Sequence, residues 1–138
     1  MTAAGADRAP FDGSDREALM DLLARHAQLT DDGQWETRVE LYTEDGEFTS
    51  LDGVTRAGRD QLREAFSATA GRLVGKHITA NTVLEVDGDR ASGWTDYAFF
   101  LVTAEGISVV SVGRYHDEFA RGPSGWRFRS RRIEPLTA

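Results

Sequence analysis

The spacing of hydrophobic positions changes once along the chain, from a period of three to four residues in the first half to a period of two in the second. In the first half, a stripe of inward-facing positions predicts a helix that begins at the capping box of Ser14 and Glu17 and ends before Gly33. The stripe consists of Leu19, Leu22, Leu23, His26 and Leu29. We therefore expect a first helix with one buried face.

Two shorter helices are expected to follow the first. The sequence predicts one over residues 35–43, where an acidic run that finishes at Gly46 would end it. A short strand over residues 47–51 should come next. A third helix is expected over residues 59–69, because apolar side chains recur there at helical spacing. The first half of the chain is therefore expected to be mainly helical.

After Gly75 the alternation of apolar and polar residues predicts strands rather than helices. The expected strands cover residues 76–86, 90–103, 107–120 and 126–133. Short turns rich in glycine separate them, beginning with a tight hairpin at Gly88. Helices followed by an antiparallel meander are typical of an α+β fold, in which helices pack on one face of a curved sheet.

Composition limits the classes of partner and cofactor. The 138 residues fit one domain over residues 14–136, preceded by a flexible arm over residues 1–13. The net charge of −7 argues against a nucleic-acid partner, and the absence of cysteine excludes thiolate chemistry. No dinucleotide or phosphate-loop motif and no histidine cluster occurs, so we expect no metal, flavin or nicotinamide cofactor.

The segment before the first helix is small and polar, without the apolar region of a signal peptide. No apolar run approaches the roughly 20 residues that a membrane span needs. We therefore expect a cytoplasmic protein with no membrane partner.

Two residues suggest acid–base chemistry. Asp31 lies at the expected end of the first helix, where a negative charge is mildly unfavourable, so another requirement should select an acid there. His77 lies at the start of the first long strand, and a nearby carboxylate would hold its imidazole in one tautomer. The alternatives are a solvated turn around Asp31 and a structural role for His77.

Strand alternation suggests which side chains surround this pair. If His77 points inward, Asn81 points inward as well; Tyr97 and Phe99 would face it from the next strand, and His116 would lie outside the pocket. His26 lies on the inward stripe of the first helix and is as compatible with the core as with the pocket. The residues expected to contact a substrate are His26, Trp35, Phe48, Phe66, Asn81, Tyr97, Phe99, Ser111 and Tyr115.

Several motifs, in this order and spacing, resemble the SnoaL-like branch of the nuclear-transport-factor-2-like superfamily, which includes polyketide cyclases and has scytalone dehydratase as a more distant relative. The motifs are Asp31-x-x-x-Trp35, Leu41-Tyr42-Thr43-Glu44-Asp45, Val86-Asp87-Gly88-Asp89-Arg90-Ala91, Gly113-Arg114-Tyr115-His116-Asp117 and Gly125-Trp126-Arg127. The resemblance implies a cone-shaped sheet wrapped around the N-terminal helices, with an apolar pocket at its open end.

The resemblance also implies functional residues. Dehydratase-like members use an aspartate at the end of the first helix and a histidine at the start of the first long strand, which match Asp31 and His77. Their second pocket histidine matches Leu101, and the phenolic partners near Thr30 and Ser50 are absent, so the match covers half of that active site.

We expect a small cofactor-independent enzyme that catalyses cyclisation, isomerisation or dehydration of a hydrophobic, oxygenated metabolite of polyketide or related origin. His77 would transfer the proton and Asp31 would orient it; in an alternative assignment Asp31 is the base. The other function class is a binding or dimerisation module of the same fold. A homodimer is expected, because the strand from Ile107 to Phe119 carries apolar residues on both faces.

Overall fold

The computed structural model describes residues 13–138 and confirms the α+β class. Its elements, in chain order, are α1 (Gly13–Asp31), α2 (Trp35–Glu40), β1 (Tyr42–Thr49), β2 (Thr55–Ala57), α3 (Arg59–Thr69), β3 (Gly75–Asp87), β4 (Arg90–Thr103), β5 (Gly106–Gly122) and β6 (Gly125–Pro135). The arm predicted over residues 1–13 lies outside the described residues, apart from Gly13, with which α1 begins. No helix in the described range is both long and apolar enough to cross a membrane.

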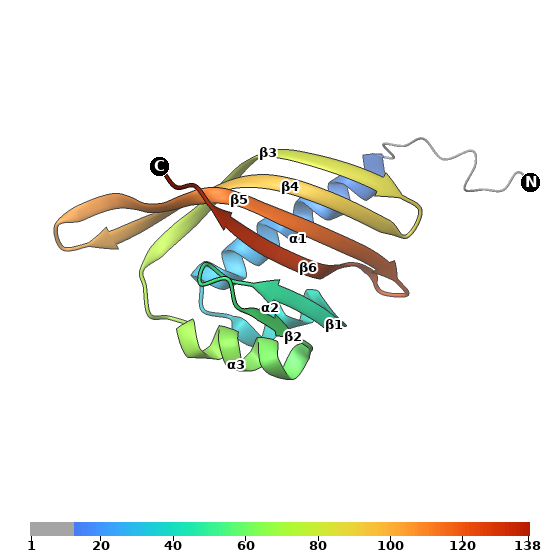
Figure 1. The fold of residues 1–138 in the computed structure, drawn as a ribbon, viewed down its shortest axis with the longest axis horizontal. Helices are drawn as coiled ribbons and strands as arrows, with labels where there is room; N and C mark the ends of the chain where they lie inside the picture. Colours follow the sequence, from blue (N-terminus) through green and yellow to red (C-terminus); the bar gives the residue numbers. More distant parts are fainter. Residues whose placement is uncertain (1–12) are drawn as a thin grey trace, which may run out of the picture.

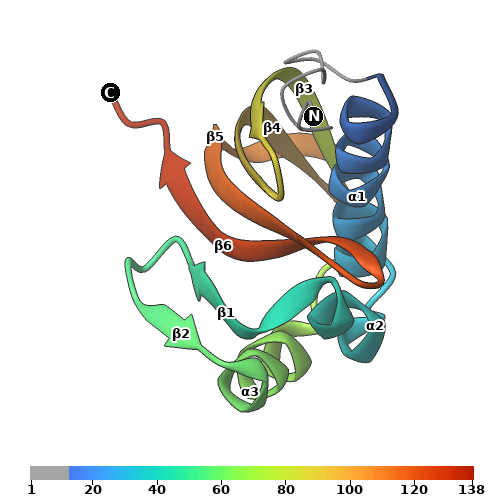
Figure 2. The ribbon, with the colours of Figure 1, turned by 90° about the vertical axis from the view of Figure 1, so that its right-hand side faces the viewer.

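The six strands form one sheet in the order β2-β1-β6-β5-β4-β3. Neighbouring strands are antiparallel except β1 and β6, which run parallel. The long strands β3 to β6 lie side by side, with α1 running across one face of them (Figure 1). Seen from the end, the sheet is curved and unclosed, and the helices lie on its inner side (Figure 2). The sheet therefore has a covered inner face and an outer face that no described element covers.

The core lies between the helices and the inner face. Its largest fully buried hydrophobic side chains come from α1, α3, β1, β5 and β6 and include Leu19, Leu62, Phe66, Tyr42, Phe119 and Phe128. Aromatic rings connect these elements, since Tyr42 stacks on Phe128 at 5.2 Å between ring centroids and Phe128 lies 5.0 Å from Phe119. Four of the five residues predicted for the stripe of α1 are buried, and Leu29 is half-buried.

The end of α1 determines where Asp31 points. Gly33 has a φ of 70°, a left-handed conformation that glycine adopts without strain. Its amide donates to the carbonyl of Thr30, and the amide of Gln34 donates to the carbonyl of Leu29. This pair of hydrogen bonds is the Schellman arrangement, which stops the helix and leaves Asp31 in its final turn.

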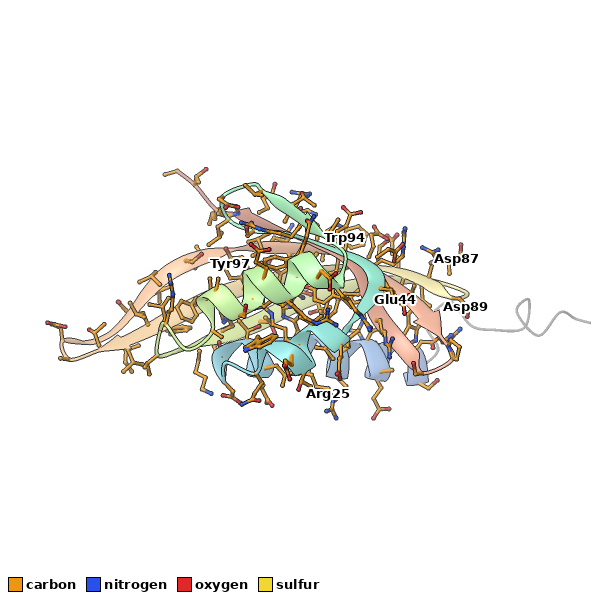
Figure 3. All side chains as sticks on the ribbon, turned by 90° about the horizontal axis from the view of Figure 1, so that it is seen from below. Arg25, Glu44, Asp87, Asp89, Trp94 and Tyr97 are labelled. Carbon is orange, nitrogen blue, oxygen red and sulfur yellow. The ribbon has the colours of Figure 1, made fainter. Side chains whose placement is uncertain are left out.

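The other end of α1 is held by Arg121 of β5. Its guanidinium bonds to the carboxylates of Asp15 and Asp89 and to the carbonyl of Gly88, and it lies over the ring of Trp126. In Figure 3, Asp87 and Asp89 mark the tip of the β3–β4 hairpin beside the start of α1. This contact fixes the helix along the sheet.

Two predicted elements need correction. The second helix ends at Glu40 rather than at residue 43, and the residues from Tyr42 onward belong to β1. The acidic run that was expected to end a helix instead lies where the pairing of β1 with β6 shifts register, between Tyr42 and Glu47. A bulge absorbs these residues and pairing with β6 overrides their local preference. The short strand β2 was not predicted.

A buried polar network runs beneath the inner face. Arg131 makes two 2.8 Å bonds to the carboxylate of Asp117, and its Nη1 donates to Nδ1 of His26 at 3.3 Å. An arginine can only donate, so Nδ1 of His26 accepts and its Nε2–H donates to the hydroxyl of Tyr42 at 2.9 Å. Burial and the charge of Arg131 hold the pKa of His26 well below its usual range. His26 is therefore a neutral core residue.

We predict that His26 makes stability sensitive to mild acid. In the unfolded chain it takes up a proton near its ordinary pKa of about 6.5, whereas in the folded protein it stays neutral. The unfolded state then binds more protons, so the free energy of unfolding is highest above about pH 6.5 and falls below it, by at most about 1.4 kcal/mol per pH unit. His26→Gln keeps a donor for Tyr42 and should flatten the fall between about pH 6.5 and pH 5. Urea unfolding of both proteins at several pH values checks this; equal slopes would contradict it.

Candidate functional site

An apolar cavity of about 730 Å³ opens between the ends of the three helices and the inner face of the sheet. Its volume lies within the roughly 300–1,000 Å³ of small-molecule sites. The wall consists mostly of aromatic and aliphatic side chains, interrupted by polar groups from the helices, from β3, β4 and β5, and from the segment between β1 and β2. In this cavity a large apolar hollow meets titratable side chains, among them Asp31, Arg38 and His77.

Asp31 and His77, which come from α1 and β3, meet at the wall of this cavity. The Nδ1 atom of His77 lies 2.6 Å from Oδ1 of Asp31, and the backbone amide of His77 donates to Oδ2 at 2.9 Å. The side chain of Asp31 is 4% exposed and that of His77 is 22% exposed. Both carboxylate oxygens are thus occupied by one residue, and the acid is shielded from solvent.

This contact determines the tautomer of the neutral imidazole. A carboxylate only accepts, so Nδ1 of a neutral His77 carries the proton and Nε2 keeps its lone pair. Within residues 13–138, no protein atom forms a hydrogen bond with Nε2. The ring packs against Phe99 at 4.5 Å between centroids, which limits its rotation. The arrangement presents an oriented proton acceptor to an apolar space.

The aromatic wall is formed by β4 and β5. Tyr97 stacks on Tyr115 at 4.6 Å between centroids, and its hydroxyl lies 3.0 Å from Oγ of Ser111. Burial raises the pKa of Tyr115 to about 12, so the phenol stays protonated at neutral pH. The hydroxyls of the two tyrosines, Tyr97 and Tyr115, can therefore donate hydrogen bonds to an oxygenated ligand.

Most residues expected to contact a substrate line the cavity. They are Trp35, Phe48, Phe66, Tyr97, Phe99, Ser111 and Tyr115. His26 does not line it, because it lies in the core network described above. His116 lies on the outer face, as alternation predicts, with Nε2 3.0 Å from the carboxylate of Glu134.

The expected position of Asn81 in the pocket is wrong. The pairing of β3 with β4 shifts register between Ala80 and Val83, and Asn81 adopts a left-handed φ of 57° inside this bulge. Its side chain is exposed and donates to the carboxylate of Asp96, which also binds Arg114. A bulge reverses the alternation that placed Asn81 on the same face as His77.

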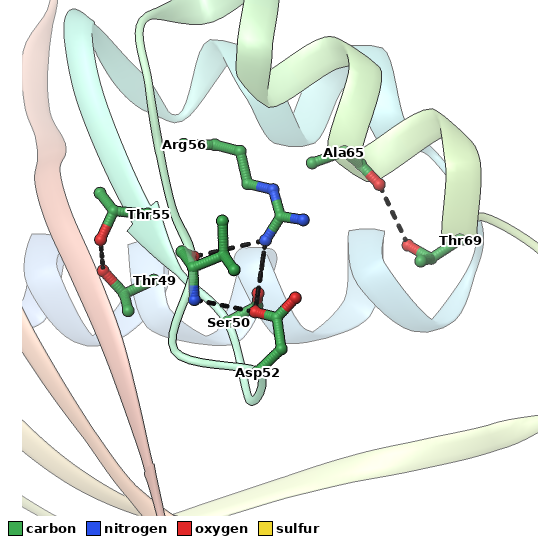
Figure 4. A network of polar contacts seen from close by, with 8 residues as sticks. Thr49, Ser50, Asp52, Thr55, Arg56, Ala65 and Thr69 are labelled. Carbon is green, nitrogen blue, oxygen red and sulfur yellow. Dashed lines mark hydrogen bonds and ion pairs between the residues drawn. The ribbon is translucent and has the colours of Figure 1, made fainter.

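Sequence reasoning missed the polar groups on the helical side of the cavity. At its mouth, Nη1 of Arg56 donates to Oγ of Ser50 at 2.7 Å and approaches Asp52 at 3.4 Å, with Ala65 and Thr69 of α3 nearby (Figure 4). Deeper in, Arg38 of α2 lines the wall. Arg38 lies three residues after Trp35 and therefore on the same helix face, so the prediction of Trp35 in the pocket could have indicated Arg38 as well.

No group of three histidine, cysteine or acidic side chains that could hold a metal ion occurs among residues 13–138. The polar groups of the cavity wall include an imidazole held by a carboxylate, hydroxyl groups on β4 and β5, and a guanidinium on α2.

Solved structures with a similar fold cover nearly the whole chain. Rv3472, a protein of unknown function from Mycobacterium tuberculosis, is 31% identical with a TM-score of 0.87, covering 92% of this chain and 79% of that one. An NTF2-like protein with a cystatin-like fold from Novosphingobium aromaticivorans is 26% identical with a TM-score of 0.82, covering 91% and 84%. ActVI-ORFA from Streptomyces coelicolor is 19% identical with a TM-score of 0.78, covering 87% and 96%, and shares the fold.

A search of curated proteins finds no match to the chain. The family model of the SnoaL-like domain, in contrast, matches residues 13–132, which is most of the sequence. The fold, the position of the cavity and this match agree with the resemblance seen in the sequence motifs. The chain therefore belongs to the SnoaL-like domain family.

Proposed function

We propose that the protein is a small enzyme that moves a proton on a hydrophobic, oxygenated substrate held in the cavity. His77 is the proton-transferring group and Asp31 orients it. The observation that carries this proposal is the 2.6 Å contact between Nδ1 of His77 and Oδ1 of Asp31, which leaves Nε2 as an acceptor at the wall of an apolar cavity. The reaction class is isomerisation, cyclisation or dehydration through a carbanion or enolate next to a carbonyl group.

The proposed step uses only side chains of this chain. Nε2 of His77 takes a proton from a carbon adjacent to the substrate carbonyl, and the electron pair of that C–H bond moves toward the carbonyl oxygen to give an enolate. The imidazolium that forms is stabilised by the carboxylate of Asp31, 2.6 Å away. Return of the proton from Nε2 to another atom of the enolate completes isomerisation. In cyclisation the enolate carbon attacks a second carbonyl, whose oxygen takes the proton. In dehydration a β-hydroxyl group takes the proton and leaves as water.

The geometry supports His77 rather than Asp31 as the base. One oxygen of Asp31 faces the imidazole and the other accepts the backbone amide of His77. With a side chain that is 4% exposed, the carboxylate has little surface to offer a substrate, whereas His77 is 22% exposed. A carboxylate in this position orients and stabilises a partner.

The apolar wall supports a substrate with fused or extended rings. Phe48, Phe66 and Phe99 offer ring faces or edges, while hydroxyls come from Tyr97 and Ser111. A cavity of about 730 Å³ holds a molecule of two to three rings, in the range of drug-sized ligands. Polyketide-derived ring systems, which combine aromatic surface with carbonyl and hydroxyl oxygens, are one class with these properties.

A second candidate function is a ligand-binding module in which Asp31 and His77 form a structural pair. The backbone bond from His77 to Asp31 favours it, because that bond ties the end of α1 to the start of β3 whatever the imidazole does. In that case the imidazole would stabilise the fold and would not accelerate any reaction.

We predict that the protein accelerates exchange of the acidic C1 protons of 2-tetralone, a bicyclic ketone probe, in D₂O. Asp31→Asn and His77→Ala should each lower this rate by about 10²–10⁴-fold, the usual contribution of a positioned acid–base group. The double variant should be little slower than either single one, because the two residues act as a unit. Proton NMR of the probe measures all four proteins.

The control is His116→Ala, since His116 lies on the outer face and should exchange the probe at the wild-type rate. Circular dichroism melting establishes that each variant is folded. Wild-type exchange no faster than buffer, or single variants that keep the full rate, would disprove the proton-transfer role. Variants that unfold would support the binding module instead.

We also propose that the protein forms a homodimer through the outer face of its sheet. Exposed apolar side chains lie there on three adjacent strands: Ile78 and Val112 flank the partly buried Ala98 in register, and Val102 pairs with Ile107. A bulge between Phe99 and Phe100 shifts the pairing, so Val109 joins the same outer face. We define the outer apolar face as Ile78, Val102, Ile107, Val109 and Val112, whose exposed fractions run from 38% to 71%. Apolar patches of this kind commonly mark association surfaces.

Sedimentation equilibrium at micromolar concentration should therefore give twice the chain mass of 15.2 kDa. Val109→Glu combined with Val112→Glu places two charges on the outer apolar face and should give a monomer, because unpaired charges are costly to bury. Met20→Glu, on the exposed side of α1, is the matched control and should remain a dimer. A wild-type monomer would contradict this assembly.

A further inference from the structure

Arg38 is a buried cation at the wall of the cavity, and no described residue forms an ion pair or hydrogen bond with its side chain. The residue is 8% exposed, and its guanidinium carbon lies 3.6 Å from the ring centroid of Phe66 and 5.4 Å from that of Phe48. Within residues 13–138 its side chain makes no ion pair or hydrogen bond, and its Nε atom is buried without an acceptor. A group with five fixed donors is thus left without an acceptor beside an open space.

The other internal arginines show that this is unusual for the molecule. Arg131, the second arginine buried in the described chain, donates from Nε and Nη2 to Asp117 and from Nη1 to His26. Arg121 is paired with Asp15 and Asp89. Arg56, at the mouth of the cavity, is held by Ser50 and the carbonyl of Val54. Arg59 also has a buried Nε without an acceptor, but its Nη2 donates to the carbonyl of Tyr42. Arg72 lines the cavity as well, but it is exposed to solvent. Among the described residues, Arg38 is therefore the arginine that is both buried and unpaired at the cavity wall.

A charge in this position is costly unless something completes it. Removing a guanidinium from water is unfavourable, and its contacts with the rings of Phe66 and Phe48 offset only part of that cost. Burial lowers the pKa of Arg38 to about 10, which still leaves it protonated at neutral pH. The charge of Asp31 favours the protonated guanidinium, but Asp31 forms no hydrogen bond with Arg38; its two oxygens bond to His77.

We propose that Arg38 binds a carboxylate of the substrate, so that the cavity selects hydrophobic carboxylic acids. The guanidinium matches a carboxylate with two parallel hydrogen bonds, and the low polarity around it strengthens the contact. Phe48 and Phe66 keep the guanidinium plane in place. This inference rests on the proposed function for the presence of a ligand and names the substrate class. It assigns the charged end of the ligand to α2 and leaves the reacting carbon to His77 on β3.

The test compares two probes of equal shape, 2-naphthylacetic acid, which is ionised at neutral pH, and the neutral 2-naphthylacetamide. Isothermal titration calorimetry with the wild-type protein should show the acid binding about 10–100-fold more tightly, the range expected for charge-assisted hydrogen bonds. In Arg38→Met this preference should disappear while the affinity for the amide stays close to that of the wild type. Arg38→Lys, which keeps the charge but not the planar fork, should keep a reduced preference.

Melting temperatures separate this role from a structural one. Arg38→Met removes an unpaired buried charge and should not lower Tm. Arg131→Met, the matched control, leaves Asp117 buried without its partner and should lower Tm clearly. A fall in Tm for Arg38→Met comparable with that of Arg131→Met would overturn the assignment. So would equal affinities of the two probes for the wild type, equal weakening of both probes in Arg38→Met, or no binding of either.

The binding test of Arg38 and the exchange test of His77 can succeed or fail independently. The preference for the acid should persist in His77→Ala, whose rate of 2-tetralone exchange bears on proton transfer alone. A wild-type protein that prefers the acid but does not exchange 2-tetralone would retain the Arg38 site and disprove the enzyme. The reverse result would retain the enzyme and disprove the carboxylate site.

Discussion

The packing of the curved sheet against α1 determines both the core and the cavity. Along most of α1 the inner face is filled, with Phe119 and Phe128 packed among the leucines of the helix stripe. At the C-terminal end of the helix this filling stops, because Gly33 turns the chain toward α2 and away from the sheet. The aromatic side chains of β4 and β5 then face an open space instead of a helix. The cavity is therefore the unfilled end of the same core.

The buried charges follow a pattern that separates structure from function. The pair of Arg131 and Asp117 is complete and lies beneath the cavity, where it also supports Tyr115 through the guanidinium face at 3.9 Å. In the pair of Asp31 and His77, Nδ1 is hydrogen-bonded to the carboxylate, whereas Nε2 has no hydrogen-bond partner among the described residues. The guanidinium of Arg38 has no hydrogen-bond acceptor among residues 13–138. The hydrogen bonds of the Arg131–Asp117 network are all made within the protein. Nε2 of His77 and the guanidinium of Arg38, in contrast, face the same apolar cavity, and a ligand can supply their missing hydrogen-bond partners.

Local sequence signals predicted most of the elements. The bounds of α3 and β4 were predicted to the residue, because periodicity and glycine turns agree there. Asp31 and His77 were expected as a pair from the family resemblance, and the structure places their side chains in contact. The position of Asn81 was not predictable, since a bulge in β3 depends on how β4 pairs with it. Tyr42 was assigned to a helix because its parallel pairing with β6 involves residues far along the chain. Arg38 was missed because an arginine in a short helix is ordinarily exposed.

The central claim is that Asp31 holds His77 with Nδ1 protonated and Nε2 available at the cavity wall. Nitrogen-15 NMR of the histidine rings measures this directly, because a protonated and an unprotonated ring nitrogen have well-separated chemical shifts. In alkaline buffer, with the ring neutral, the account predicts that Nδ1 of His77 carries the proton and that Asp31→Asn disturbs this tautomer. A proton on Nε2 in the wild-type protein, or a tautomer that does not respond to Asp31→Asn, would contradict it.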